Sequence, residues 1–317
     1  MITGRLSIYV AVTFLVALAT AHTVLKSRLA NAGEEQTQVI PIITTSELVV
    51  GENRFAFGLF KNNRPVENAV SVVRLYAIEG TQARFTAEFK APYRLVENTQ
   101  AGKRVHRHAD GTRHVRRADS AVGGLYVSQI VFPRPGAWGV EILVKDKDGK
   151  AAAARTMVTV RERPATPAVG SPAPRSRNLI AKDVKDLREI DTSSPPDPRL
   201  HQIRIADAIE QRKPQLIVFA TPQFCTTRMC GPVVDIVRSL FPAYGKRIAF
   251  IHQEIWQDYA DRKPFDTVEE WGLKTEPWIF IVDGQGIIRA KFEGLVTQHE
   301  LQQALERVAA TDAESRS

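Results

Sequence analysis

Short apolar stretches separated by turn residues occupy the first half of the chain. They are rich in β-branched and aromatic residues and are bounded by Gly, Pro, Asn and Asp, a pattern that favours strands over helices. We expect strands at residues 54–60, 70–78, 84–89, 125–132, 138–144 and 156–160. Short strands at this spacing predict an antiparallel β-sandwich over residues 38–162.

From about residue 200 onward, helical and extended periodicity alternate. Apolar residues recur at helical spacing over 203–212, 232–244, 267–273 and 298–309. Apolar stretches at 214–220 and 247–251 predict strands, and 278–282 and 287–292 flank the turn residues 283–286, which predict a hairpin. This order predicts an α/β domain over residues 200–311, with a mixed sheet covered by helices on both faces.

Residues 163–199 join the two predicted domains. Pro, Ala and Ser dominate 164–174, which favours an extended linker. Residues 178–190 show some helical periodicity, which the prolines at 195, 196 and 198 end. We therefore expect a linker followed by a lead-in that packs on the second domain.

The N-terminal segment, residues 1–32, contains an apolar stretch from about Leu6 to Leu25 after the basic residue Arg5. This length is roughly enough to span a bilayer as a helix, so we expect an uncleaved membrane anchor. The small residues at 30–32 also fit the cleavage site of a signal peptide. Either alternative predicts that the rest of the chain is extracytoplasmic, as a membrane-anchored, secreted or periplasmic protein.

Composition and charge limit the classes of binding partner that we expect. The chain has 317 residues, long enough for two domains, and a net charge of +8. Six Lys or Arg residues fall between Lys103 and Arg117, against the single acidic residue Asp110. No nucleic-acid-binding module accompanies this excess, so we expect no nucleic acid and consider an anionic membrane surface as a partner.

The chain contains only two cysteines, Cys225 and Cys230. In an exported protein such a pair is expected to be oxidised or to cycle between states. Residues five apart on a helix have Cα atoms about 8–9 Å apart, whereas a disulfide needs about 7 Å or less. A bridged pair therefore requires a loop, with the helix beginning at Pro232 and both sulfurs near its positive end. That end and Arg228 would stabilise a reactive thiolate.

Two segments resemble those of the thioredoxin superfamily. Residues 216–220 resemble the strand that precedes the redox cysteine, and residues 275–280 resemble the segment whose proline is cis and faces the disulfide. The resemblance covers roughly residues 203–309 and departs from the family in its Cys-x4-Cys spacing. A local resemblance in residues 135–140 relates the sandwich to immunoglobulin-like accessory domains.

The thioredoxin resemblance implies thiol–disulfide exchange with a protein thiol or disulfide, without a cofactor. Cys225 would attack and Cys230 would resolve. Pro277 would position the peptide, with Glu276 and Trp278 at the substrate surface, although Glu276 is unusual for the family. A second register, which places Cys230 at the first cysteine of the motif and Val233 at the second, stays open.

Other functions remain as alternatives. A purely structural disulfide would make the domain a redox-inactive binding module, although so short a loop stabilises by only about 2 kcal/mol. The faint similarity of residues 221–227 to a peroxidatic site lacks the right spacing. His106, His108 and His114 are candidates for metal binding and copper delivery, against the alternative of a solvated basic hairpin. We expect His252 and Glu254 on a loop rather than in a site.

Overall fold

The computed structural model describes residues 39–96, 104–107, 113–116, 123–145, 149–225 and 227–316. The predicted N-terminal anchor or signal peptide and His108 lie outside these residues. Within the described ranges, none of the helices is both long and apolar enough to cross a membrane.

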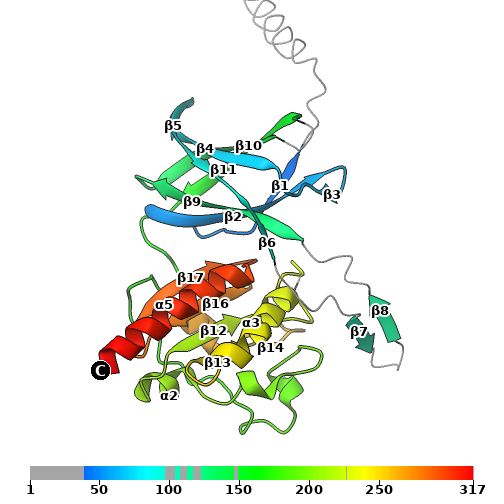
Figure 1. Ribbon diagram of the computed structural model, residues 1–317, viewed down its shortest axis with the longest axis vertical. Helices are drawn as coiled ribbons and strands as arrows, with labels where there is room; N and C mark the ends of the chain where they lie inside the picture. Colours follow the sequence, from blue (N-terminus) through cyan, green and yellow to red (C-terminus); the bar gives the residue numbers. More distant parts are fainter. Residues whose placement is uncertain are drawn as a thin grey trace, which may run out of the picture.

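The N-terminal domain is a sandwich of two antiparallel sheets (Figure 1). The first has the order β1-β2-β9-β6, with β3 on the edge of β2, and the second has the order β11-β10-β4-β5. When the sandwich strands other than β3 and β5 are lettered A to G in chain order, the first sheet is ABED and the second is GFC with β5 added. This is the arrangement of an immunoglobulin-like sandwich, as predicted. The strands are β1 (Ile40–Ile43), β2 (Gly51–Lys61), β3 (Arg64–Pro65), β4 (Val70–Glu79), β5 (Gln82–Lys90), β6 (Tyr93–Leu95), β9 (Gly124–Phe132), β10 (Gly136–Lys145) and β11 (Ala151–Val160).

Alternation along the strands builds the sandwich core. In β4, Val73, Leu75 and Ala77 are buried while the residues between them are more exposed, because successive side chains point to opposite faces. The fully buried Trp138 of β10 packs edge-on against Phe132 of β9, with ring centroids 5.3 Å apart. The two sheets therefore share one apolar core.

The C-terminal domain is built on a four-stranded sheet of order β13-β12-β16-β17. β12 runs parallel to β13 and antiparallel to β16, which pairs antiparallel with β17. The main elements are α2 (Ile205–Glu210), β12 (Gln215–Phe219), α3 (Cys230–Tyr244), β13 (Ala249–Gln253), α4 (Asp266–Glu270), β16 (Trp278–Val282), β17 (Ile288–Glu293) and α5 (Gln298–Arg316).

Helices cover both faces of this sheet. Alternate residues of β12 and β16 pack either against α3 and α5 or against α2 and α4. Strands buried on both faces need continuous apolar sequence, which is the pattern the sequence carries. All eight predicted elements are present, and the bounds of β16 agree with those predicted.

The structure differs most from the sequence-based prediction in the lead-in. No α-helix forms over 178–190; the described residues there hold only a 3-10 turn, η1 (Leu187–Glu189), followed by η2 (Pro198–Leu200). Several side chains of this stretch are buried, including Asn178 and Asp191. The lead-in therefore packs tightly on the α/β domain. The short strands β1, β3 and β6 and the pair β14 (Trp256–Asp258) and β15 (Lys263–Pro264) were also not predicted.

The two domains contact each other directly (Figure 1). The guanidinium of Arg54 on β2 binds the carboxylate of Glu300 on α5 at 2.7 Å. Ala56 of β2 and Leu125 of β9 belong to the same buried apolar cluster as α3 and α5. At Gly294, where φ is +71°, a Cβ atom would collide with the backbone oxygen of Thr44. The domains therefore share part of a core.

Candidate functional site

The cysteine pair lies in the loop that follows β12. The backbone N–H of Cys225 donates to the carbonyl of Thr221 at 3.0 Å, and the N–H of Arg228 donates to the carbonyl of Cys225 at 3.3 Å. Arg228 adopts a left-handed conformation with φ +59°, which reverses the chain before α3. Cys225 is therefore outside the helix, as predicted, but α3 begins at Cys230 rather than at Pro232.

The two cysteines are free thiols whose sulfur atoms lie within 4.8 Å of each other. Cys225 is half-buried, whereas Cys230 is fully buried under the loop in the first turn of α3. One sulfur is therefore accessible to a partner and the other is reached only through it.

Glu276 lies beside the buried thiol. Its Oε2 atom is 3.4 Å from the Sγ atom of Cys230 and accepts a hydrogen bond from the backbone N–H of Thr221 at 3.0 Å. The peptide bond between Glu276 and Pro277 is cis, which confirms the prediction for that proline. Glu276 thus contacts the cysteine pair itself.

The pKa values of the three groups are coupled. Hydrogen bonds from the Cys230 thiol, which contribute most, and from the Thr227 hydroxyl, 3.1 Å away, together lower the pKa of Cys225 to about 5. Burial raises the pKa of Cys230. Burial and the nearby charge of Cys225 raise the pKa of Glu276 to about 7. The thiolate is thus stabilised by hydrogen-bond donors, which include the backbone N–H of Cys230 at the start of α3, and the added effect expected of Arg228 is not among the main causes.

Trp278 does not lie beside the cysteines. Its side chain is buried in the apolar cluster on the opposite face of the sheet from Cys230, and its indole N–H donates to the hydroxyl of Thr275 at 3.0 Å. The aromatic surface next to the site is instead Phe224, whose exposed ring stacks on that of Tyr259 with centroids 4.4 Å apart.

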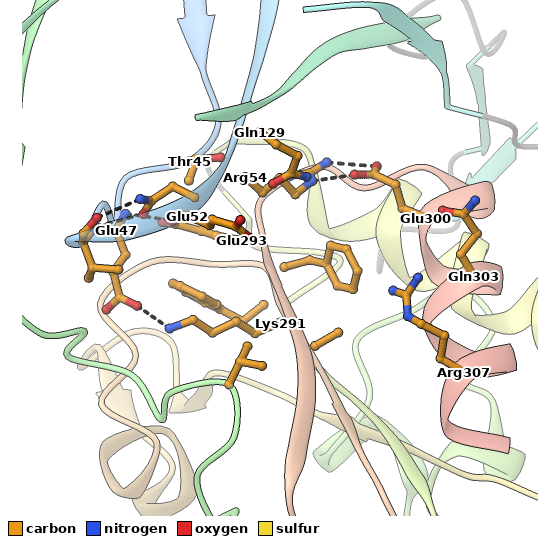
Figure 2. Close-up of a pocket in the computed structure, with 16 residues that line it drawn as sticks. Thr45, Glu47, Glu52, Arg54, Gln129, Lys291, Glu293, Glu300, Gln303 and Arg307 are labelled. Atoms are coloured by element: carbon orange, nitrogen blue, oxygen red, sulfur yellow. Dashed lines mark hydrogen bonds and ion pairs between the residues drawn. The ribbon is translucent and has the colours of Figure 1, made fainter. Parts of the chain in front are cut away.

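A cavity of about 550 Å³ lies between the two domains (Figure 2). Trp278 borders it, together with charged side chains that are already paired, such as Lys291 with Glu47 at 2.7 Å. Figure 2 also shows the pairing of Arg54 with Glu300 across the cavity. These pairs connect the domains, and neither cysteine lines the cavity.

The histidines singled out in the sequence fall in two different places. His106 on β7 (Arg104–Arg107) is the register partner of His114 on β8 (Arg113–Arg116), in agreement with a hairpin. His252, expected on a loop, lies in β13 and is fully buried, and Glu254 after it is also buried.

Two clusters of three potential metal ligands occur among the described residues. One is formed by the cysteine pair and Glu276, whose sulfur atoms suit soft metal ions. The other consists of Asp191, His201 and His252. No spacing in the sequence indicated this second cluster, because neither the lead-in, which carries Asp191, nor the segment around His201 was expected to contain a site.

No protein-family model and no curated protein sequence matches the chain. Solved structures similar to parts of it include CopC from Methylosinus trichosporium OB3b, with 10% identity and a TM-score of 0.20 over 39% of this chain and 97% of that one. Murine CRIg is 14% identical, with a TM-score of 0.21 over 39% of this chain and 98% of its own. Similarity of this degree assigns neither a fold nor a function to the chain.

Proposed function

We propose that the C-terminal domain is thioredoxin-like and exchanges disulfides with a protein partner outside the cytoplasm. The observation that carries the proposal is the pairing of an accessible thiol of low pKa, Cys225, with a buried thiol, Cys230, beside a cis proline. Low thiol pKa and partial exposure are the marks of a reactive cysteine.

The topology of the C-terminal sheet supports the proposal that this domain is thioredoxin-like. β12 lies in the middle of the sheet and leads directly into the cysteine loop, and α3 begins at the second cysteine. The cis Pro277 immediately precedes β16, the neighbour of β12. This is the placement of strand, cysteines and proline that the family resemblance implies.

The proposed reaction has two steps. The Cys225 thiolate attacks one sulfur of a partner disulfide, a Cys225–partner bond forms, and the other partner sulfur leaves with the electron pair. The Cys230 thiol then gives its proton to the Glu276 carboxylate, which is 3.4 Å away, and the resulting thiolate attacks the Cys225 sulfur. The Cys225–Cys230 disulfide forms and the partner leaves with both sulfurs reduced; the reverse sequence oxidises it.

The surface around Cys225 suits an extended, apolar segment of a partner. The exposed ring of Phe224, the residue before Cys225 in the chain, stacks on that of Tyr259. Stacked exposed aromatics offer a large contact area with little loss of side-chain freedom on binding. We assign the partner contact to these rings and the segment of Pro277, with Glu276 acting on the cysteines.

The test is a trapping experiment with the purified chain and a peptide that contains one disulfide. Reduced Cys230→Ser is expected to accumulate a protein–peptide mixed disulfide, detected by intact mass, because the resolving thiol is missing. Cys225→Ser is expected to trap none. Equal trapping by both variants, or none with either, would contradict the proposed roles.

The rival function is a binding module with a fixed Cys225–Cys230 staple. The reduction potential separates the two, since structural disulfides lie below about −300 mV and working ones higher. Equilibration of the chain with glutathione buffers of defined ratio measures it. A bridge that stays oxidised at the most reducing ratio would favour the staple.

A further inference from the structure

Asp191, His201 and His252 meet behind the cysteine loop, although they come from three separate segments. Asp191 follows η1, His201 caps η2, and His252 lies in β13. All three side chains are at most 1% exposed. The Nε2 atom of His201 lies 3.2 Å from Oδ2 of Asp191, and the Nδ1 atom of His252 lies 3.5 Å from Oδ1.

The hydrogen bonding of His252 identifies which nitrogen is available. Its Nε2 atom lies 2.9 Å from the carbonyl oxygen of Ala220, so that nitrogen must carry a hydrogen and donate it. Nδ1 has no hydrogen-bond partner, and in the neutral ring it presents a lone pair to the Asp191 carboxylate. Two facing lone pairs are unfavourable at a site without solvent, and either a proton on His252 or a metal ion between the two groups would relieve this.

The surrounding contacts resemble those that orient metal ligands. A ligating histidine usually donates its other N–H to a carbonyl or carboxylate, as His252 does to Ala220. The Asp191 carboxylate is held by the backbone N–H groups of Ser193 at 2.9 Å and Asp197 at 2.8 Å. His201 Nε2 approaches one Asp191 oxygen at 3.2 Å and His252 Nδ1 approaches the other at 3.5 Å, and potential ligand atoms of the three residues all lie within 4.8 Å of one another.

The charges around the cluster leave room for a divalent cation. Arg238 lies 3.8 Å from Asp191 and would oppose a cation, but it also lies 3.6 Å from Asp197 and 3.7 Å from Asp235. Arg199 pairs with Asp197, and the buried Glu254 has one carboxylate oxygen without a hydrogen-bond partner. The two guanidiniums of Arg199 and Arg238 thus face three aspartates, Asp191, Asp197 and Asp235, while burial raises the pKa of Glu254.

We propose that Asp191, His201 and His252 bind a divalent transition-metal ion, with Zn²⁺ the best fit to two imidazoles and a carboxylate. The ion would be structural because the site is sealed from solvent. It would tie the lead-in to β13 and, through the His252–Ala220 hydrogen bond, to the strand end that precedes the cysteine loop. This site is separate from the proposed redox pair and does not depend on it.

The test is metal analysis of the purified full-length chain, followed by chelator dialysis and reloading with Zn²⁺ or Co²⁺. We expect one equivalent per chain and a Tm that falls on chelation and recovers on reloading. His201→Gln is expected to lose the equivalent, whereas His299→Gln, at an exposed position on α5, keeps it.

The Co²⁺ form separates this site from the cysteines and needs no variant to fold. Visible d–d bands without thiolate charge-transfer absorption, retained in a Cys225→Ser, Cys230→Ser double variant, support the proposal. Thiolate absorption would move the ion to the cysteine pair and overturn it. A chain that takes up no Zn²⁺ and shows no change in Tm with excess Zn²⁺ would show that a proton occupies the gap, and would also overturn it.

Discussion

The Sγ atom of Cys230 lies 3.4 Å from Oε2 of Glu276, so a buried thiol and a largely buried carboxyl group face each other next to Pro277. Negative charge on either group disfavours charge on the other, since both are shielded from water. The Cys230 thiol therefore keeps its proton, and its hydrogen bond to Cys225 is the largest of the contacts that lower the pKa of Cys225 to about 5. The low pKa of the accessible cysteine depends on the high pKa of the buried one.

Removal of the Cys230 thiol should therefore raise the pKa of Cys225. In the wild-type chain we expect the alkylation rate of Cys225 by iodoacetamide to reach half its maximum near pH 5. In Cys230→Ala the largest stabilising hydrogen bond is lost, and the midpoint should move toward the ordinary value of about 8.5. Thr227→Val should move it less. The same midpoint in wild type and Cys230→Ala would contradict the assignment.

Glu276→Gln should stabilise the chain at alkaline pH. The folded-state pKa of Glu276 is about 7, above its ordinary value of 4.5, so the folded chain holds more protons than the unfolded chain between these values. Stability contributed by this group is therefore present below about pH 4.5 and is lost as pH rises through 7. We expect Glu276→Gln to gain about 1–2 kcal/mol at pH 8, allowing for partial solvent exposure.

Urea unfolding of Glu276→Gln and wild type at pH 4.5 and pH 8 measures this difference, which should vanish at the lower pH. With both cysteines present, Glu276→Gln should also slow the release of the peptide from the mixed disulfide by roughly 10²-fold, while formation of that mixed disulfide stays unchanged. If the difference in free energy of unfolding between Glu276→Gln and wild type were the same at pH 4.5 and pH 8, ionisation of Glu276 would not destabilise the folded chain.

Gly294→Ala should destabilise the contact between the domains. The new Cβ atom would meet the backbone of Thr44, and φ of +71° is itself unfavourable for alanine. We expect a loss of about 2–4 kcal/mol in the free energy of unfolding. Gly80→Ala is the matched control, because its φ is +61° but no atom lies within 4 Å of the added carbon. Equal losses would show that backbone conformation alone sets the cost.

The Arg54–Glu300 pair should contribute more than a surface pair. Its side chains are 11% and 17% exposed, whereas those of Arg84 and Glu79 in the sandwich are 68% and 55% exposed. A double-mutant cycle with alanine should give a coupling energy of about 1–3 kcal/mol for the first pair and below about 0.5 kcal/mol for the second. Similar coupling energies would contradict the burial argument.

Much of the fold was predictable from the sequence because periodicity reports burial. The continuous apolar run of β16 gave its bounds correctly, since both faces of this strand are covered. The helical periodicity of residues 178–190 was misleading, because this segment makes hydrogen bonds with residues distant in the sequence instead of forming a helix. The backbone N–H of Ala181 donates to the backbone carbonyl of His201, and the side-chain oxygen of Asn178 accepts from the backbone N–H of Ile205. Such distant partners leave no periodic signal.

The site was predictable only in part. The order of elements and the family resemblance placed Cys225, Cys230 and Pro277 in one region, but the direction of the Glu276 side chain toward Cys230 depends on packing. Asp191 and His201 were missed because their partner His252 is about 50 residues or more away in sequence. Asp191, His201 and His252 come together only once the lead-in and the segment that follows it are folded.

The apolar contacts of Ala56 and Leu125 with the helices of the other domain have a practical consequence for anyone who clones this protein. An expression fragment that starts in the Pro-rich stretch would encode every element of the α/β domain and yet leave hydrophobic surface open to water where β2 and β9 had covered it. Such a fragment would be prone to self-association. Recombinant work on the cysteine pair should therefore keep the sandwich attached.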